Sequence, residues 1–365
     1  MRIVRLANFI TPSSGGLRTG LRELGKRYAE AGHQPVLVMP GPGYSDLLTE
    51  QGRVITLPGP KVPGMHGYRI LLRQAEVKSL LRELKPDSIE VSDRSTLRWT
   101  GKWARANGVK SVMVSHESLD GLLRVARIPG RGWLSRQLNR RTARGYDRIL
   151  CTTAWAAREF AFAGATNVSR VPLGVDLEFF HPSKADSVLR SSYAKPDEVL
   201  LVCCTRLSPE KRPQRALITL ESLLAQGVKA TMVIAGDGPL RSTLERKAAH
   251  LPVSFAGWVS DREHLARLLA TADVVVAPGP IETFGLAALE ALSGGTPTVV
   301  SASSALPDVV GDAGVAVHGD DMSAGVMQLL ARPEQSRRPA ARARAEQFSW
   351  DAAAAGFLAV HESLG

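Results

Sequence analysis

The chain has 365 residues, more than a single compact core usually serves, so two domains are expected. Hydrophobic residues make up 44% of the chain and charged residues 22%, which are ordinary globular values and exclude a disordered or fibrous protein. No apolar run approaches the roughly 18 residues of a membrane span, and the first residues, MRIVRLANFITPSSGG, lack the apolar segment of a signal peptide. The expected location is the cytoplasm.

Short apolar runs alternate with amphipathic stretches, which is typical of parallel sheets wrapped by helices. In the first half, strands are predicted near 2–7, 35–39, 53–57, 88–92, 110–115, 147–152 and 168–171. Helices are predicted there near 17–31, 70–84, 96–107, 133–145 and 154–163. These elements form one doubly wound domain, residues 1–172, and the turn-rich stretch 173–197 then breaks the rhythm as an interdomain connection.

The alternation restarts and predicts a second doubly wound domain, residues 198–349. Its strands are expected near 199–205, 230–235, 253–256, 272–277, 296–300 and 314–317. Its helices are expected near 212–226, 239–249, 261–270, 285–293, 304–310 and 321–331. Residues 350–365 form a last helix, apolar on one face, that could pack against either domain, including back on the first. The fold class is α/β, with two Rossmann-like domains whose strand carboxyl ends face a central cleft.

The net charge of +11 is concentrated in the first half of the chain. Residues 1–150 carry 26 Lys and Arg against 12 Asp and Glu, whereas residues 151–365 carry 20 against 23. The stretch 121–148 alone holds eight arginines and one aspartate. Apolar residues interleaved with them are Leu122, Leu123, Trp133, Leu134 and Leu138. A solvated face, a nucleic-acid site and an anionic lipid surface are the three interpretations, and the apolar residues favour lipid over duplex DNA.

The segment 279–301, GPIETFGLAALEALSGGTPTVVS, indicates a ligand site at a helix N-terminus. A buried strand ends in Pro-Gly-Pro, and a helix starts near Phe284, Gly285 and Leu286, where backbone amides and the helix dipole favour an anion. Glu282 lies before those amides and Glu290 inside the helix, so one ligand could meet amides between two carboxylates that accept hydrogen bonds from hydroxyls. The alternative is that both glutamates are ordinary helix residues.

Other loops supply candidate ligand contacts. Arg206 and Lys211, in CTRLSPEKRP after the second domain's first strand, could bind a diphosphate, and the alternative is a solvated loop. His116 ends a strand and could hold a sugar hydroxyl, although a lone histidine is more often a packing residue. The turn in FAGWVSDREHL could offer backbone groups to a nucleotide base.

The glycine-bearing turn 7–24 invites a dinucleotide interpretation, but its Gly15-Gly16-x-x-x-Gly20 order departs from the fingerprint of dehydrogenases, and this disfavours an oxidoreductase.

No metal-binding motif occurs in the sequence, so no metal or other cofactor is expected. The three cysteines lack metal-ligand spacing and are interpreted as reduced, buried packing residues: Cys151, Cys203 and Cys204.

The ordered set RLSPEK, AGDGPLR, FAGWVSD, ETFGLAALEAL, GGTPTVVS and VPLGVDLEFFHP resembles the family-4 retaining glycosyltransferases of the GT-B fold. The resemblance covers nearly the whole chain. The stretches ANFITPSSGGLRTG, EVSDRSTLR and VSHESLDGL look most like an actinobacterial subgroup that contains phosphatidylinositol-mannoside mannosyltransferases. The departure is Lys211-Arg212-Pro213, where the family usually has Lys-Gly, which retains the charge and is expected to change the turn.

The resemblance implies a role for each matched position. Glu282 would contact the donor sugar, Glu290 the ribose, and the amides from Phe284 to Leu286 the sugar and phosphate. Arg206 and Lys211 would neutralise the diphosphate leaving group, and His116 would touch the sugar near its reacting face. The remaining donor contacts implied are Gly15 and Gly16 beside the diphosphate and Val259 and Ser260 beside the base.

The leading hypothesis is a retaining transferase that moves an α-mannosyl unit from GDP-mannose to an acceptor such as a phosphatidylinositol mannoside. It would then lie peripherally at the inner face of the plasma membrane, with residues 121–148 on the anionic surface. One alternative keeps the chemistry with UDP-glucose or UDP-N-acetylglucosamine and a soluble cyclitol or secondary-metabolite acceptor. A basic nucleic-acid-binding protein is the non-enzyme alternative, and nucleic acid is not expected as a partner.

Overall fold

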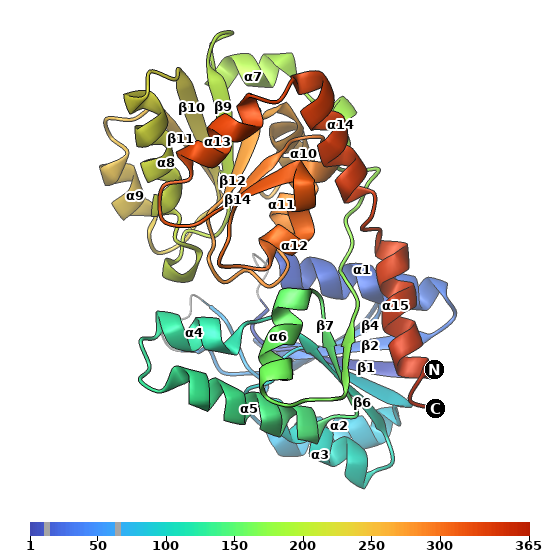
Figure 1. Ribbon diagram of the computed structural model, residues 1–365. Coiled ribbons are helices and arrows are strands. Elements are labelled where there is room, and N and C mark those ends of the chain that lie inside the picture. The colour runs from blue at the N-terminus through green and yellow to red at the C-terminus, as the bar shows by residue number, and fades with distance from the viewer. Residues whose placement is uncertain (11–14, 63–66) are drawn as a thin grey trace. The chain divides into compact units, whose positions relative to one another are not determined.

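The structure is a computed structural model that describes residues 1–10, 15–62 and 67–365, and it divides into two compact units (Figure 1). Unit 1 comprises Met1–Gly174 together with Trp350–Gly365, and unit 2 comprises Val175–Ser349. The last helix therefore belongs to unit 1. Most of the expected connection, residues 173–197, is part of unit 2, where it forms a short 3-10 turn and a helix.

Unit 1 is an eight-stranded sheet in the order β3-β4-β2-β1-β5-β6-β7-β8, parallel except for the edge strand β3. Its strands are β1 (Arg2–Leu6), β2 (Gln34–Gly41), β3 (Ser45–Thr49), β4 (Gly52–Pro58), β5 (Ser88–Val91), β6 (Lys110–Ser115), β7 (Arg148–Cys151) and β8 (Val168–Arg170). Its helices are α1 (Gly16–Glu30), α2 (Gln74–Leu84), α3 (Trp99–Ala106), α4 (Leu119–Val125), α5 (Arg131–Gly145), α6 (Ala154–Phe162) and α15 (Trp350–Glu362). Because helices cover both faces, the central strands are apolar in successive residues rather than alternating.

A buried polar cluster attaches α15 to the sheet of unit 1. Arg5 on β1 donates through Nε to Glu90 Oε1 on β5 at 2.9 Å, and the Tyr28 hydroxyl on α1 donates to Glu90 Oε2 at 2.9 Å. His361 on α15 lies 3.4 Å from the same Oε2 and 2.7 Å from the Ser88 hydroxyl. Burial raises the pKa of Glu90, but the Arg5 charge and the His361 contact outweigh burial and hold that pKa well below its usual range.

Unit 2 is a six-stranded parallel sheet in the order β11-β10-β9-β12-β13-β14. Its strands are β9 (Val199–Cys204), β10 (Ala230–Ala235), β11 (Val253–Gly257), β12 (Val274–Ala277), β13 (Thr298–Ser301) and β14 (Gly314–Val317). Its α-helices are α7 (Ser187–Tyr193), α8 (Gln214–Ala225), α9 (Arg241–Lys247), α10 (Arg262–Thr271), α11 (Leu286–Ser293), α12 (Leu306–Val310), α13 (Ser323–Leu330) and α14 (Glu334–Ala345). Its 3-10 turns are η1 (Pro182–Lys184), η2 (Pro209–Lys211) and η3 (Gly311–Ala313).

The strand order of unit 2 is that of the doubly wound dinucleotide-binding fold, and it fixes where a ligand can bind. The chain winds outward from β9 in one direction through β10 and β11 and in the other through β12, β13 and β14. The loops after β9 and β12 therefore run to opposite faces of the sheet and leave a crevice at the strands' carboxyl ends. An apolar core that includes Leu201, Ile234 and Val276 holds these strands in place.

Candidate functional site

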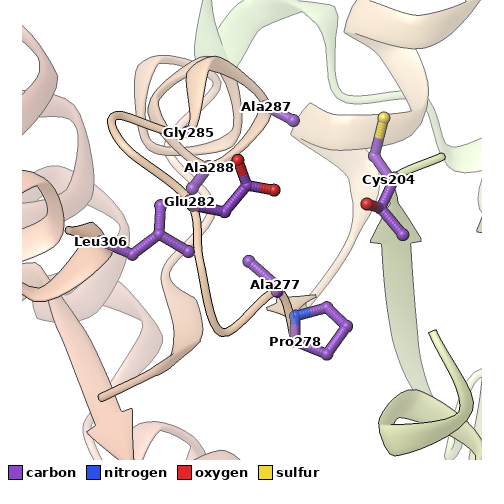
Figure 2. A pocket seen from close by; sticks show the side chains of 10 residues that line it. Cys204, Ala277, Pro278, Glu282, Gly285, Ala287, Ala288 and Leu306 are labelled. Atoms are coloured by element: carbon purple, nitrogen blue, oxygen red, sulfur yellow. The ribbon is translucent and has the colours of Figure 1, made fainter. Parts of the chain in front are cut away.

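A cavity of about 30 Å³ lies where β9 and β12 separate in unit 2 (Figure 2). It is lined by Cys204, Thr205, Ala277, Pro278, Gly279, Glu282, Gly285, Ala287, Ala288 and Leu306. Figure 2 shows the loop with Glu282 and Gly285 on one side and Cys204 at the end of β9 on the other. A space of this volume holds a water molecule or two, so it can take only one end of a larger ligand.

Gly285 sets the turn that leads from Glu282 into α11. It has φ +86 and ψ 64, in the left-handed region, and a Cβ there would stand 3.2 Å from Leu306 Cγ and still closer to its Cδ2. The neighbouring Phe284 and Leu286 are buried, and the Phe284 ring packs edge-on against Phe348. The predicted helix start is confirmed, because α11 begins at Leu286 and directs its first amides toward the strand ends.

Glu282 and Lys211 form an ion pair at this cavity. Lys211 Nζ, in η2 after β9, donates to Glu282 Oε1 at 2.6 Å, and each side chain is about one-fifth exposed. The carbonyl of Glu282 accepts from the Ala305 amide at 2.8 Å, which fixes the loop from behind. The sequence predicts contacts with different parts of a ligand for these two residues, whereas the structure joins them directly.

Glu290 is half-buried on α11, and burial raises its pKa to about 7 against the opposing charge of Arg262. Cys151 and Cys203 are fully buried, as the sequence suggests. Cys204 differs, because it is only half-buried and lines the cavity beside Thr205. The sequence analysis names neither Cys204 nor Thr205 as a ligand contact, and the available signal was their position at the carboxyl end of the second domain's first strand.

The other residues predicted in unit 2 lie in loops at the strands' carboxyl ends. Arg206 follows β9 and is exposed. Val259 is half-buried and Ser260 exposed, in the segment between β11 and α10. Arg212 has φ +47, the left-handed conformation that glycine usually supplies. The arginine thus takes a backbone conformation that is open to a glycine at this position.

Three of the predicted residues belong to unit 1. His116 follows β6 and is half-buried, and burial lowers its pKa to about 4, so its imidazole is neutral at pH 7. Gly15 caps the N-terminus of α1, Gly16 is its first residue, and both are exposed. A Cβ on Gly15 would meet no atom within 4 Å, and residues 11–14 of the glycine-bearing turn lie outside the described residues.

The basic stretch 121–148 forms most of α4 and all of α5, which pack against each other in unit 1. Trp133 is 69% exposed, and Leu122, Val125 and Ile128 are also exposed large apolar residues. Exposed arginines in this stretch are Arg124, Arg127, Arg131, Arg136, Arg141 and Arg144. By contrast, Arg140 is half-buried and donates through Nε to the Ala163 carbonyl at 3.2 Å, so part of its role is to hold α5 against the end of α6.

In residues 1–10, 15–62 and 67–365, no group of three or more His, Cys, Asp and Glu side chains is arranged to hold a metal ion. Within the same ranges, no helix has both the length and the apolar character needed to cross a bilayer.

Comparisons with known proteins bear on both units. The family model described as Glycosyltransferase Family 4 matches residues 14–179, and the model described as Glycosyl transferases group 1 matches residues 187–346. The chain is 48% identical over 366 aligned positions to the GDP-mannose-dependent alpha-(1-6)-phosphatidylinositol dimannoside mannosyltransferase of Mycobacterium tuberculosis, covering 98% of this chain and 95% of that protein. It is 26% identical to the corresponding monomannoside mannosyltransferase, over 97% and 96% of the two chains.

Solved structures share the fold at low sequence identity. Sucrose-phosphate synthase from Thermosynechococcus elongatus superposes with a TM-score of 0.78 at 19% identity, covering 100% of this chain and 98% of the other. Anabaena Alr3699/HepE in complex with UDP and glucose gives 0.74 at 18% identity, with the same coverage. The chain thus belongs to glycosyltransferase family 4, as an enzyme of the GT-B fold from the group of actinobacterial phosphatidylinositol-mannoside mannosyltransferases.

Proposed function

We propose that this enzyme transfers an α-mannosyl unit from GDP-mannose to a hydroxyl of a phosphatidylinositol mannoside, with retention at the anomeric carbon. The observation that carries the proposal is the cavity between β9 and β12, with the Lys211–Glu282 ion pair at its edge and the N-terminus of α11 beside it. The donor and the acceptor class come from the mannosyltransferase that is 48% identical.

The ion pair has a direct role in this proposal. Lys211 and Glu282 neutralise each other across 2.6 Å. A diphosphate placed at the α11 N-terminus competes for the Lys211 ammonium, since its charge is larger and its oxygens are spread over two phosphates. The Glu282 carboxylate is then free to accept hydrogen bonds from the hydroxyls of the sugar. Donor binding thereby exchanges one ion pair for two ligand contacts.

The chemical step rests on stabilising charge rather than on a covalent intermediate. As the glycosidic bond to the diphosphate breaks, negative charge grows on the leaving phosphate, and Lys211, Arg206 and the α11 amides stabilise that charge. The acceptor hydroxyl attacks the anomeric carbon on the face from which the diphosphate leaves, and this gives retention. A phosphate oxygen takes the proton of that hydroxyl. In this scheme the protein's own cations serve the leaving group, so the transfer rate should be unchanged by EDTA.

Donor binding is tested first, by a thermal-shift panel of GDP, UDP, ADP and their mannose and glucose conjugates. A ligand that binds only the native state raises the melting temperature by mass action, so GDP and GDP-mannose should give the largest shift. A larger shift with UDP and its sugars would replace the donor in this proposal and leave the fold assignment intact.

Transfer is tested with three single variants, Lys211→Ala, Glu282→Ala and Arg206→Ala. Each should lose most of the transfer activity, at least about a hundredfold, because each removes charge or hydrogen bonding at the reacting groups. The matched control is Lys229→Ala, which breaks an exposed ion pair with Asp197 in the same unit, at the amino ends of β9 and β10. Turnover near the wild-type rate in all three site variants, with the control also normal, would reject the site.

We also propose that the exposed surface of α4 and α5 binds an anionic membrane that carries the acceptor. Trp133, Leu122 and Val125 could enter the headgroup region, while the surrounding arginines attract anionic lipid, at about 1 kcal/mol for each cation near the surface. A lipid acceptor of the kind named for the 48% identical mannosyltransferase needs such a surface. A soluble acceptor does not.

Sedimentation with anionic and with neutral vesicles separates these two acceptors. We expect binding to anionic vesicles that weakens with added salt, and loss of that binding in a variant with Arg127, Arg136 and Arg141 replaced by Glu. A variant with Arg246→Glu and Lys247→Glu on α9 is the control, because both of these residues are exposed cations in unit 2. If all variants bind anionic vesicles equally, or if the wild type does not bind them, the soluble acceptor is favoured.

A further inference from the structure

Arg212 stands in a conformation that its side chain disfavours. With φ +47 and ψ 50 it is one of four non-glycine residues with positive φ among the described residues. It follows Lys211 directly, at the end of η2, and precedes Pro213 at the start of α8. A glycine would take this backbone conformation without the steric cost, but it would lack the contacts that the arginine side chain makes.

Those contacts lead to a second arginine through a shared carboxylate. Arg212 donates through a terminal guanidinium nitrogen to Asp320 Oδ2 at 3.0 Å, and Asp320 Oδ1 lies 3.2 Å from Arg215 Nε. Asp320 belongs to the loop between β14 and α13. Arg212 and Asp320 are nearly half exposed, whereas the Arg215 side chain is only 4% exposed.

Arg215 contacts residues at the carboxyl ends of three neighbouring strands, β12, β13 and β14. One of its terminal nitrogens donates to the Pro278 carbonyl after β12 at 2.7 Å and to the Ser301 hydroxyl at the end of β13 at 3.0 Å. With Asp320 after β14, a single buried guanidinium thus reaches the loops of three neighbouring strands. Pro278 itself lines the cavity, so the contacts of Arg215 reach the cavity wall.

We propose that Arg212, Asp320 and Arg215 are positioning residues that hold Lys211 within reach of Glu282 and of the donor's diphosphate. Arg212 is covalently next to Lys211, and its guanidinium is joined through Asp320 to Arg215, which donates to the carbonyl of the cavity residue Pro278. The proposal rests on the proposed function only for the identity of the group that Lys211 binds. The placement of Lys211 against Glu282 does not depend on it.

Melting temperature and turnover together distinguish a positioning role of Arg212 from a purely stabilising one. An ion pair between two half-exposed side chains adds little to stability, and the backbone cost at Arg212 opposes even that. Replacing Arg212 by glycine removes both effects at once, so the melting temperature should change little. Any large effect on turnover must then come from the position of Lys211, whose displacement by about 1 Å can cost up to a hundredfold in rate.

The deciding experiment compares Arg212→Gly with Arg212→Lys and with the exposed-pair control Lys229→Ala. In Arg212→Gly we expect kcat with GDP-mannose to fall by about tenfold or more, with the acceptor KM within about twofold and the melting temperature within about 2 °C of the wild type. Arg212→Lys keeps a cation that can reach Asp320 and should recover part of the rate. Asp320→Asn should lower kcat in the same way, although it also removes the charge partner of buried Arg215.

Wild-type kcat in Arg212→Gly would overturn the positioning role, as would a fall in kcat that merely follows a fall in melting temperature. A crystal structure of Arg212→Gly gives a readout that needs no turnover. The proposal expects Lys211 Nζ to leave its 2.6 Å contact with Glu282 Oε1, and an unchanged contact would overturn it. If the wild-type enzyme itself transfers nothing from GDP-mannose, the proposed function fails, and this structure still decides the positioning role.

Discussion

Gly285→Ala is the substitution whose cost can be worked out most directly from the structure. An alanine at φ +86 carries a left-handed backbone penalty of roughly 1–2 kcal/mol. Its Cβ would also stand 3.2 Å from Leu306 Cγ and closer still to Cδ2, and relieving such overpacking costs roughly 1–3 kcal/mol more. We therefore expect the free energy of unfolding of unit 2 to fall by roughly 2–5 kcal/mol.

Gly227→Ala is the matched control for the backbone part of this cost. Gly227 also lies in unit 2 and has φ +81, but a Cβ there would meet no atom within 4 Å. Its loss should stay near roughly 1–2 kcal/mol. Urea denaturation followed by circular dichroism compares the two variants, and calorimetry gives their affinities for GDP. Equal losses would refute the steric reasoning, and a normal GDP affinity in Gly285→Ala would refute the placement of the donor at this turn.

Three further predictions concern ionisable groups that are half-buried or buried. The folded protein holds the Glu290 proton more tightly than the unfolded chain, with a pKa near 7 against 4.5, so the resulting stabilisation is lost as pH rises through 7. Between about pH 5 and pH 8, the melting temperature of Glu290→Gln should therefore fall less than that of the wild type. Parallel plots of melting temperature against pH would contradict this. His116 shows the reverse sign, since its pKa of about 4 means that stability falls as pH drops from 6.5 through 4, and His116→Gln should flatten that acid limb. Glu90→Ala leaves Arg5 buried without its partner and should cost roughly 3–5 kcal/mol in urea denaturation. The exposed-pair variant Glu76→Ala should cost far less, and equal losses of stability in the two variants would contradict the importance of the Glu90 network.

Much of the fold follows from local patterns in the sequence. The apolar runs of the central strands and the Gly285 turn depend on neighbouring residues, so the start of α11 was predicted to within one residue. Elements without a clear pattern were missed. The edge strand β3 exposes most of its side chains, and α14 contains Pro339 and is rich in arginine. The helix predicted over 70–84 begins only at Gln74, because the Leu71 amide bonds to the Asn8 side chain at 2.8 Å instead.

The site was predicted as a set of residues and not as an arrangement. Lys211 and Glu282 are 71 positions apart, and they meet because β9 and β12 are adjacent in the sheet, an order that no local pattern encodes. The same limit hid the contacts that join Arg215, Asp320 and Arg212, because Arg215 is in α8, Arg212 follows η2 and Asp320 lies between β14 and α13. Arg212 was recognised as a departure from the family pattern, but its left-handed backbone and its partner could be seen only in the structure.

The attachment of α15 has a consequence for how the protein is made. A ribosome delivers residues 1–174 early, yet Glu90 lacks its contact with His361 until all of unit 2 has been translated. During synthesis, the buried cluster around Glu90 therefore lacks one of its members until α15 is made. Unit 2, in contrast, can complete its core from one continuous segment of the chain. The first half to be synthesised is thus the last to complete its native contacts.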